Sequence, residues 1–140
     1  MKTAVSTRTH RGELLPAPLL HGFGTIWRVR GFLLLQIAIL LSMVSIHFGL
    51  LTGGYRHGSA GRAELFIAAV LVAGLLLTWT PWPWSRRAAT AAQSFAILGV
   101  LVGLFTIALG IGPRTMLDLT LNAALLLTLI AGLAITLRKP

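Results

Sequence analysis

The sequence predicts an all-α protein: a four-helix polytopic transmembrane bundle with up-down-up-down topology. Hydrophobic residues make up 56% of the 140 residues and charged residues only 11%, whereas soluble domains contain about 25% charged residues. The apolar residues are gathered into four charge-poor runs, each long enough to cross a bilayer as a helix. Short segments separate the runs, so consecutive helices should be antiparallel neighbours.

The limits of the four runs follow from residues that end helices or anchor them at a membrane surface. Trp27 and Arg30 precede the first run, and both residue types are common at the membrane–water boundary. Pro81 follows the second run and Pro113 the third. Because proline cannot continue a helix, these positions indicate where the second and third helices end. The helices are expected at about 31–51, 63–80, 90–112 and 116–137.

Basic residues are divided unevenly between the two sides of the predicted bundle. Residues 1–26 are basic and show no helical period, so an irregular segment is expected before a transmembrane domain at 27–140. Most Lys and Arg residues fall on the side that holds both termini, and only Arg56, Arg62 and Arg114 fall on the other. The positive-inside rule therefore predicts cytoplasmic termini. A composition rich in Ala, Leu, Gly and Arg, with few Lys, suggests a prokaryotic cell membrane.

A shift of 57 residues aligns the first half of the chain with the second. The aligned pairs are Trp27 with Trp84, Arg30 with Arg87, Gln36 with Gln93 and, after a three-residue gap, Glu64 with Asp118. These pairs favour a tandem repeat of a two-helix hairpin, although chance agreement at a chosen offset remains an alternative. Repeats of equal topology would be related by a pseudo-twofold axis along the membrane normal.

Small side chains form stripes along the first and third runs. A helix that is apolar all round is buried in protein or lipid, and a small-residue stripe lets a second helix approach closely. The residues expected in helix packing are Gly99, Gly103, Thr106 and Gly110 of the third run, and Ser42 and Gly49 of the first. The neighbouring helix could belong to this bundle or to another protein. Gln36, Met43 and His47 form a separate face of the first helix, which also needs a neighbour.

Six polar side chains are expected near the outer ends of the helices, away from the termini. They are His47, Arg62, Glu64, Arg114, Asp118 and Asn122. Ionisable residues inside membrane helices are candidates for function. However, Thr115 and Asp118 fit a capping box, and a helix-start role is favoured for Glu64 as well.

The remaining members of this predicted outer cluster also have structural interpretations. Asn122 is expected to bond to a neighbouring helix rather than to a substrate. Arg114 follows a Gly-Pro turn and is expected to be solvated, or else paired with an acid. His47 suits a helix C-terminus as a cation, which is favoured over a proton relay or a metal ligand.

The sequence shows no catalytic, cofactor-binding or metal-binding constellation, so neither an enzyme nor a cofactor is expected. There is no cysteine, and the second, third and fourth predicted helices lack histidine, which disfavours paired haem ligands. The formal net charge of +9 is attributed to topology and anionic lipid rather than to nucleic acid. The expected partners are membrane lipid and either a second copy of the chain or another membrane protein.

Two functional hypotheses follow. The leading one is a small membrane protein that acts non-enzymatically through helix–helix association, as an accessory subunit, a stabiliser or a homo-oligomer. It rests on the small-residue stripes. The alternative is a small transporter or channel with an outward-facing polar vestibule, because three predicted helices contribute to its lining. That vestibule would contain His47, Glu64, Arg114, Asp118 and Asn122.

Overall fold

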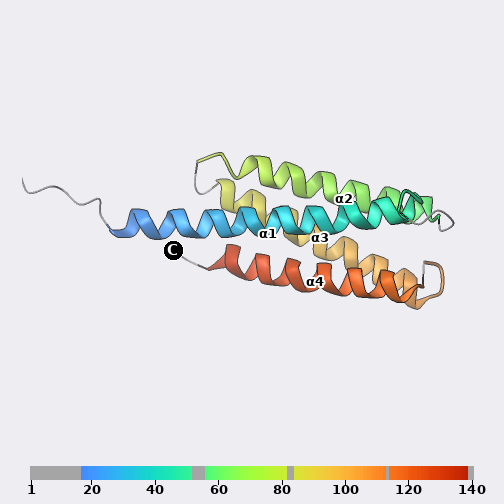
Figure 1. Ribbon diagram of the computed structural model, residues 1–140. Coiled ribbons are helices and arrows are strands. Elements are labelled where there is room, and N and C mark those ends of the chain that lie inside the picture. Colours follow the sequence, from blue (N-terminus) through green and yellow to red (C-terminus); the bar gives the residue numbers. More distant parts are fainter. Residues whose placement is uncertain (1–16, 52–55, 82–83, 113, 139–140) are drawn as a thin grey trace, which may run out of the picture.

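Four helices form a bundle in the computed structural model, which describes residues 17–51, 56–81, 84–112 and 114–138 (Figure 1). The helices are α1 (Ala17–His47), α2 (Gly58–Leu77), α3 (Trp84–Ala108) and α4 (Met116–Leu137). They follow one another in a ring: α1 packs on α2, α2 on α3, α3 on α4, and α4 on α1. The predicted all-α bundle with up-down-up-down order is confirmed.

Each helix has the length and composition of a membrane span. The spans are Gly24–His47, Gly58–Leu77, Trp84–Ala108 and Met116–Leu137. Large apolar side chains cover the outside of the bundle, among them Leu34, Phe66, Leu76, Leu98, Phe105, Leu127 and Ile130. Apolar surface of this extent is unfavourable in water but matches the acyl chains of a bilayer. The chain is therefore a multi-pass integral membrane protein.

The first three helices begin earlier than hydropathy predicts and also end earlier, at His47, Leu77 and Ala108 rather than at about 51, 80 and 112, whereas α4 matches its predicted limits. α1 begins at Ala17, inside the segment 1–26 that was expected to be irregular, and residues 1–16 lie outside the described residues. Pro18 falls in the first turn of α1, where a missing backbone N–H costs little. α2 and α3 also begin before their apolar runs. Hydropathy marks the part of a helix that lies in lipid. Backbone hydrogen bonding already begins in the polar turn that precedes that part.

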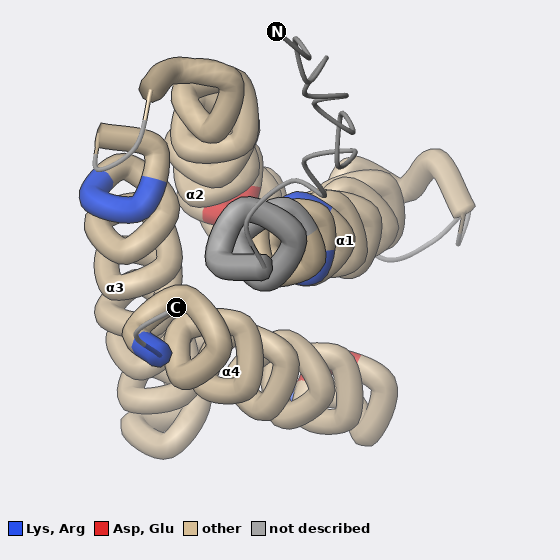
Figure 2. The backbone as a smooth tube through the Cα atoms, turned by 90° about the vertical axis from the view of Figure 1, so that its left-hand side faces the viewer, with Lys and Arg blue, Asp and Glu red and all other residues tan. Residues whose placement is uncertain are grey.

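Basic side chains gather at the end of the bundle where α1 begins and α4 ends. Viewed from that end, Lys and Arg mark the near turns of the helices, while the acidic residues lie deeper (Figure 2). Arg30 donates from Nε to Thr78 Oγ1 and from Nη2 to Thr78 O, both at 3.0 Å. Its guanidinium also lies over the Trp79 ring at 4.3 Å and the Trp27 ring at 5.0 Å. Arg30 thus joins α1 to the C-terminal end of α2.

A buried amide pair lies at the middle of the bundle, among apolar side chains of all four helices. Gln36 Nε2 donates to Gln93 Oε1 at 3.3 Å and to Thr128 O at 3.0 Å. Gln93 Nε2 donates to Thr136 Oγ1 at 3.0 Å. Gln36 thus bonds from α1 to both α3 and α4. Gly132 leaves room for the pair, because a Cβ there would collide with Gln93 Oε1 and lie 2.7 Å from Gln36 Nε2.

The contacts agree with the proposed repeat. Gln36 and Gln93, which the 57-residue shift pairs, are hydrogen-bonded to each other. The cation–aromatic pairs Arg30–Trp27 and Arg87–Trp84 have similar spacings of 5.0 Å and 5.2 Å. The α1–α2 and α3–α4 hairpins also occupy equivalent places in the ring.

Candidate functional site

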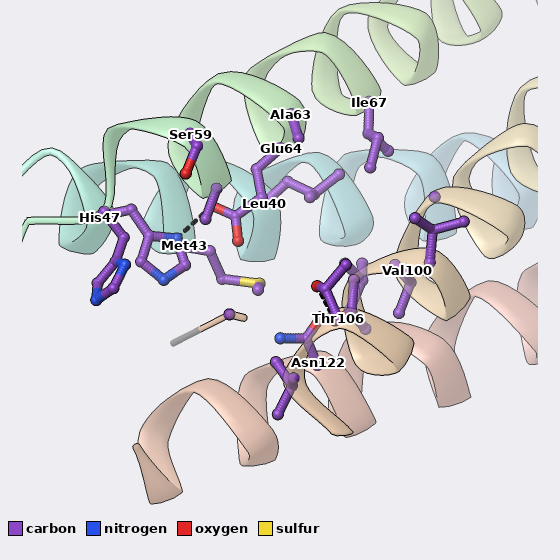
Figure 3. A pocket seen from close by; sticks show the side chains of 18 of the residues that line it. Leu40, Met43, His47, Ser59, Ala63, Glu64, Ile67, Val100, Thr106 and Asn122 are labelled. Carbon is purple, nitrogen blue, oxygen red and sulfur yellow. Dashed lines mark hydrogen bonds and ion pairs between the residues drawn. The ribbon is translucent and has the colours of Figure 1, made fainter. Parts of the chain in front are cut away.

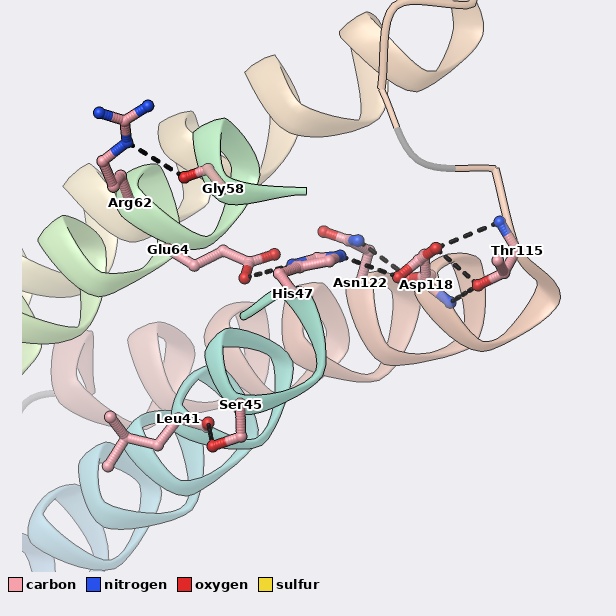
Figure 4. Close-up of polar contacts among 9 residues, drawn as sticks. All are labelled: Leu41, Ser45, His47, Gly58, Arg62, Glu64, Thr115, Asp118 and Asn122. Carbon is pink, nitrogen blue, oxygen red and sulfur yellow. Dashed lines mark hydrogen bonds and ion pairs between the residues drawn. The ribbon is translucent and has the colours of Figure 1, made fainter. Parts of the chain in front are cut away.

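His47, Glu64 and Asp118 form a hydrogen-bonded triad at the end of the bundle opposite to the arginine-rich end (Figure 4). His47 Nδ1 lies 2.7 Å from Glu64 Oε2, and His47 Nε2 lies 3.0 Å from Asp118 Oδ1. The three residues come from α1, α2 and α4. The side chains of His47 and Asp118 are 1% and 2% exposed, and that of Glu64 is 13% exposed. The triad is therefore nearly removed from solvent.

Close approach of α1 and α2 places Glu64 beside His47. The backbone N–H of His57 donates to His47 O at 2.9 Å, which ties the start of α2 to the end of α1. Gly61 is buried, and a Cβ on it would lie 3.3 Å from the side chains of His47 and Phe48. One helical turn after this contact, Glu64 faces the imidazole ring.

The two carboxylate oxygens of Asp118 make different contacts. Thr115 N donates to Asp118 Oδ2 at 3.1 Å, and Asp118 N donates to Thr115 Oγ1 at 3.1 Å. This is the predicted capping box, which is confirmed. The other oxygen, Oδ1, faces His47. The helix-start interpretation of Glu64 is wrong, because α2 begins at Gly58 and Glu64 lies in its second turn, bonded to His47.

The geometry of the triad sets its proton content. A neutral imidazole carries one N–H, so it can donate to only one of two carboxylates. The second contact becomes a hydrogen bond only if the ring is doubly protonated or the facing carboxyl carries the proton. In both forms the three side chains have a net charge of −1 rather than −2. One added proton would therefore allow both contacts of His47 to be hydrogen bonds.

A pocket of about 340 Å³ reaches the triad from the interior of the bundle (Figure 3). Its polar lining includes His47, Glu64, Thr106 and Asn122, and its apolar lining includes Leu40, Met43, Ile67, Val100 and Leu125. Glu64 is the most exposed member of the triad, so its carboxylate is the one that a molecule in the pocket would meet. Asn122 also lines the pocket, and its Nδ2 donates to Asp118 O at 2.9 Å within α4. The expected bond of Asn122 to a neighbouring helix is therefore replaced by a bond within its own helix.

The two arginines of the predicted outer cluster lie apart from the triad. Arg62 is exposed and donates from Nε to Gly58 O at 3.2 Å, and its guanidinium points away from Glu64 (Figure 4). Arg114 donates from Nε to Ile107 O at 3.1 Å and from Nη2 to Ala108 O at 3.3 Å. It therefore satisfies carbonyl groups at the C-terminal end of α3, where a cation is favoured.

The small residues of α3 have different environments along the helix. A Cβ on Gly99 would lie 2.5 Å from Ile67 Cδ1, so Gly99 packs closely on α2. Gly103 has no atom within 4 Å of a Cβ position and lines the pocket instead. Thr106 lines the same pocket and donates from Oγ1 to Gly103 O at 2.7 Å. Gly110, with φ of 84°, follows the end of the helix in the left-handed region that favours glycine.

On α1 the small residues lie on the outside of the bundle. Ser42 is exposed, and its hydroxyl donates to Ala38 O at 2.9 Å within the helix. Gly49 follows the helix end with φ of 74°. Neither packs against another helix of this chain in the way the stripe suggested. The buried face of α1 is the other one, which contains Gln36, Met43 and His47.

Comparisons with known proteins give no match: no family model, no curated protein and no solved structure is similar to this chain. Within the described ranges, no group of three or more His, Cys, Asp or Glu side chains is arranged to hold a metal ion. Sequence reasoning selected all three triad residues but missed the pocket, because its apolar lining resembles any core.

Proposed function

We propose that this protein is a small proton-coupled transporter, in which a solute in the pocket and a proton on the triad compete for the same charge. The observation that carries the proposal is that His47 and Glu64 line a pocket and that His47 bonds on to Asp118, so that residues of three helices meet beside it. A solute that interacts with Glu64 would alter the hydrogen bonds of His47 and, through it, those of Asp118. Solute binding and proton binding are thereby linked.

The energetics of the triad support a functional role over a purely structural one. Burying ionisable groups carries a desolvation cost that their mutual attraction often fails to exceed, so apolar residues of similar size would hold helices together at least as well. Ionisable residues within membrane helices are accordingly rare and are associated with ion or proton pathways. Glu64 also keeps part of its side chain open to the pocket, which a packing contact would not require.

The other half of the bundle closes the pocket toward the arginine-rich side. On the arginine-rich side of the pocket, hydrogen bonds among Gln36, Gln93 and Thr136 join α1, α3 and α4. Interhelical hydrogen bonds in membranes contribute about 0.6 kcal/mol on average. Separation of the helices at this level would give the pocket access to the arginine-rich side, as alternating access requires.

The association hypothesis receives less support. Part of the small-residue surface of α3 packs within the chain, since Gly99 packs on Ile67 of α2 and Ala92 lies where a Cβ on Gly74 of α2 would collide with it. The exposed small residues of α1 leave association with a second protein as a prediction, without a contact that favours it.

Proteoliposomes that enclose a pH-sensitive dye test the transport proposal. Choline, benzyltrimethylammonium, glycine, glucose and lactate are added outside in turn, and proton movement is recorded. We expect at least one solute to drive proton flux through the wild-type protein, and we expect Glu64→Gln and Asp118→Asn to lower that flux at least tenfold.

The control is Thr120→Val, in the same part of α4 but at an exposed hydroxyl that bonds only to Met116 O of its own helix in the described contacts. It should transport like wild type. Yield and particle size establish that each variant is folded. Equal flux in folded Glu64→Gln and wild type, or no flux with any of the five solutes, would refute the proposal.

A further inference from the structure

We infer that the ligand of the pocket is a lipophilic organic cation, which enters from the membrane between α2 and α3 and places its charge against Glu64. This inference rests on the proposed function and specifies its substrate class and its route of entry. It follows from the spacing of α2 and α3, from the charges around the pocket, and from the chemistry of the pocket walls.

α2 and α3 are close at one end and separated at the other. At the arginine-rich end, a Cβ on Gly74 would collide with the Ala92 side chain. Further along, a Cβ on Gly99 would still lie 2.5 Å from Ile67. One turn later, Gly103 has nothing within 4 Å of a Cβ position. The interface between the two helices therefore widens toward the level of Glu64.

The widened part of this interface is an opening toward lipid. Ala63 of α2 and Val102 of α3 line the pocket, yet both are exposed on the outer surface, Val102 by 63%. Large apolar side chains such as Phe66 and Phe105 are exposed near them and face the same surroundings. A molecule dissolved in the acyl-chain region can thus reach the pocket without crossing the aqueous end of the bundle.

The charges around the pocket favour a cation. The triad has a net charge of −1 when it carries one added proton and of −2 when it does not. Glu64 is its most exposed member and lines the pocket. Arg62 and Arg114, at the same end of the bundle, are engaged elsewhere, Arg62 with Gly58 O and Arg114 with the end of α3. Besides His47 and Glu64, the ionisable residue in the pocket lining is His57. A positive group beside Glu64 would replace the charge of the displaced proton. An anion would face uncompensated repulsion at low dielectric.

The walls of the pocket favour an apolar body attached to that cation. Leu40, Ile67, Val100 and Leu125 surround its inner part and offer no side-chain hydrogen-bond donor to a hydrophilic solute. A volume of about 340 Å³ is at the small end of ligand pockets, which span about 300–1,000 Å³. The space suits one ring or a short alkyl chain with a compact ammonium group.

Binding to three probes tests the ligand class. Protein in lipid nanodiscs is dialysed to equilibrium against benzyltrimethylammonium, tetramethylammonium or benzyl alcohol, with empty nanodiscs as the blank. The first probe has both charge and ring, and each of the others has only one of them. We expect benzyltrimethylammonium to bind at least tenfold more tightly than the other two, and Glu64→Gln to weaken its binding at least tenfold.

Two glycine variants test the route of entry. Gly103→Leu fills the opening between α2 and α3, whereas Gly31→Leu adds the same side chain on α1 at an exposed glycine that also has nothing within 4 Å of its Cβ position. We expect Gly103→Leu to slow the rate at which benzyltrimethylammonium binds at least tenfold and Gly31→Leu to leave that rate unchanged.

The outcomes separate this inference from the transport proposal. Equal binding of tetramethylammonium and benzyltrimethylammonium, or proton flux driven by glycine, glucose or lactate alone, would overturn the lipophilic cation while transport stands. An unchanged rate of binding in Gly103→Leu would overturn entry between α2 and α3. Proton flux that is the same in Glu64→Gln and wild type would remove the transport proposal itself.

Discussion

At the scale of single residues, the triad places an imidazole ring between two carboxylates in a site that water scarcely reaches. Replacing one residue of a buried set of ionisable side chains leaves the others buried without an opposite charge. This generally costs more folding free energy than replacing all of them together. His47 is the central member, because it contacts both Glu64 and Asp118. The cost of substitution should therefore depend on what the neighbouring residues become.

We predict that His47→Leu lowers the free energy of unfolding by about 3–5 kcal/mol, because it leaves two buried carboxyl groups without their partner. Thermal or denaturant unfolding of the purified protein in detergent measures this change. The triple variant His47→Leu, Glu64→Gln, Asp118→Asn should recover at least half of the loss, since no charge then remains buried. A triple variant as unstable as the sum of its parts would contradict the assignment of the triad as a coupled unit.

At the scale of helices, the α2–α3 interface is closest where Gly74 meets Ala92, near the arginine-rich end. The absence of a side chain at Gly74 lets the two backbones approach, as is common for small residues at helix contacts in membranes. The same pair of helices is separated at Gly103. Stability and the pocket opening thus depend on different ends of one interface.

We predict that Gly74→Leu destabilises the protein by about 1–3 kcal/mol or more, because the added side chain must push α3 away. Gly31→Leu is the matched control, since its Cβ position is open and exposed, and it should change stability by less than about 0.5 kcal/mol. Melting temperatures of the two variants in the same detergent provide the measurement. Similar melting temperatures would show that α2 and α3 are not packed as described.

At the scale of the whole molecule, the two ends of the bundle differ in charge. The end where α1 begins and α4 ends contains arginines that bind the ends of neighbouring helices, such as Arg30 on Thr78 and Arg86 on Leu137 O at 2.5 Å. The opposite end contains the triad and the pocket. The positive-inside rule predicts that the arginine-rich end lies in the cytoplasm.

The absence of cysteine makes this orientation directly testable. Ser59 is exposed at the triad end and Thr80 is exposed at the arginine-rich end. We predict that Ser59→Cys reacts with a membrane-impermeant maleimide in intact cells, and that Thr80→Cys reacts only after the membrane is opened. The reverse pattern would invert the topology and place the pocket on the cytoplasmic side.

The fold and part of the candidate site could be predicted from the sequence. Four apolar runs with short connections determine a four-helix bundle, because a backbone in lipid must satisfy its hydrogen bonds within each helix. Charged and amide residues such as His47, Asp118 and Gln36 are conspicuous in such runs, so the sequence identifies them as candidate site residues. The capping box of Thr115 and Asp118 was also predictable, because it depends only on local spacing.

Only the tertiary structure decided which of these residues meet. Rotation of α1 about its axis brings His47 rather than Ser42 into the bundle, and hydropathy cannot specify that rotation when a helix is apolar on every face. The pairing of Glu64 with Asp118 through His47 spans 17 residues on one side and 71 on the other. The pocket likewise exists because α2 and α3 separate at Gly103. Such contacts depend on the packing of distant segments, which short-range sequence patterns do not encode.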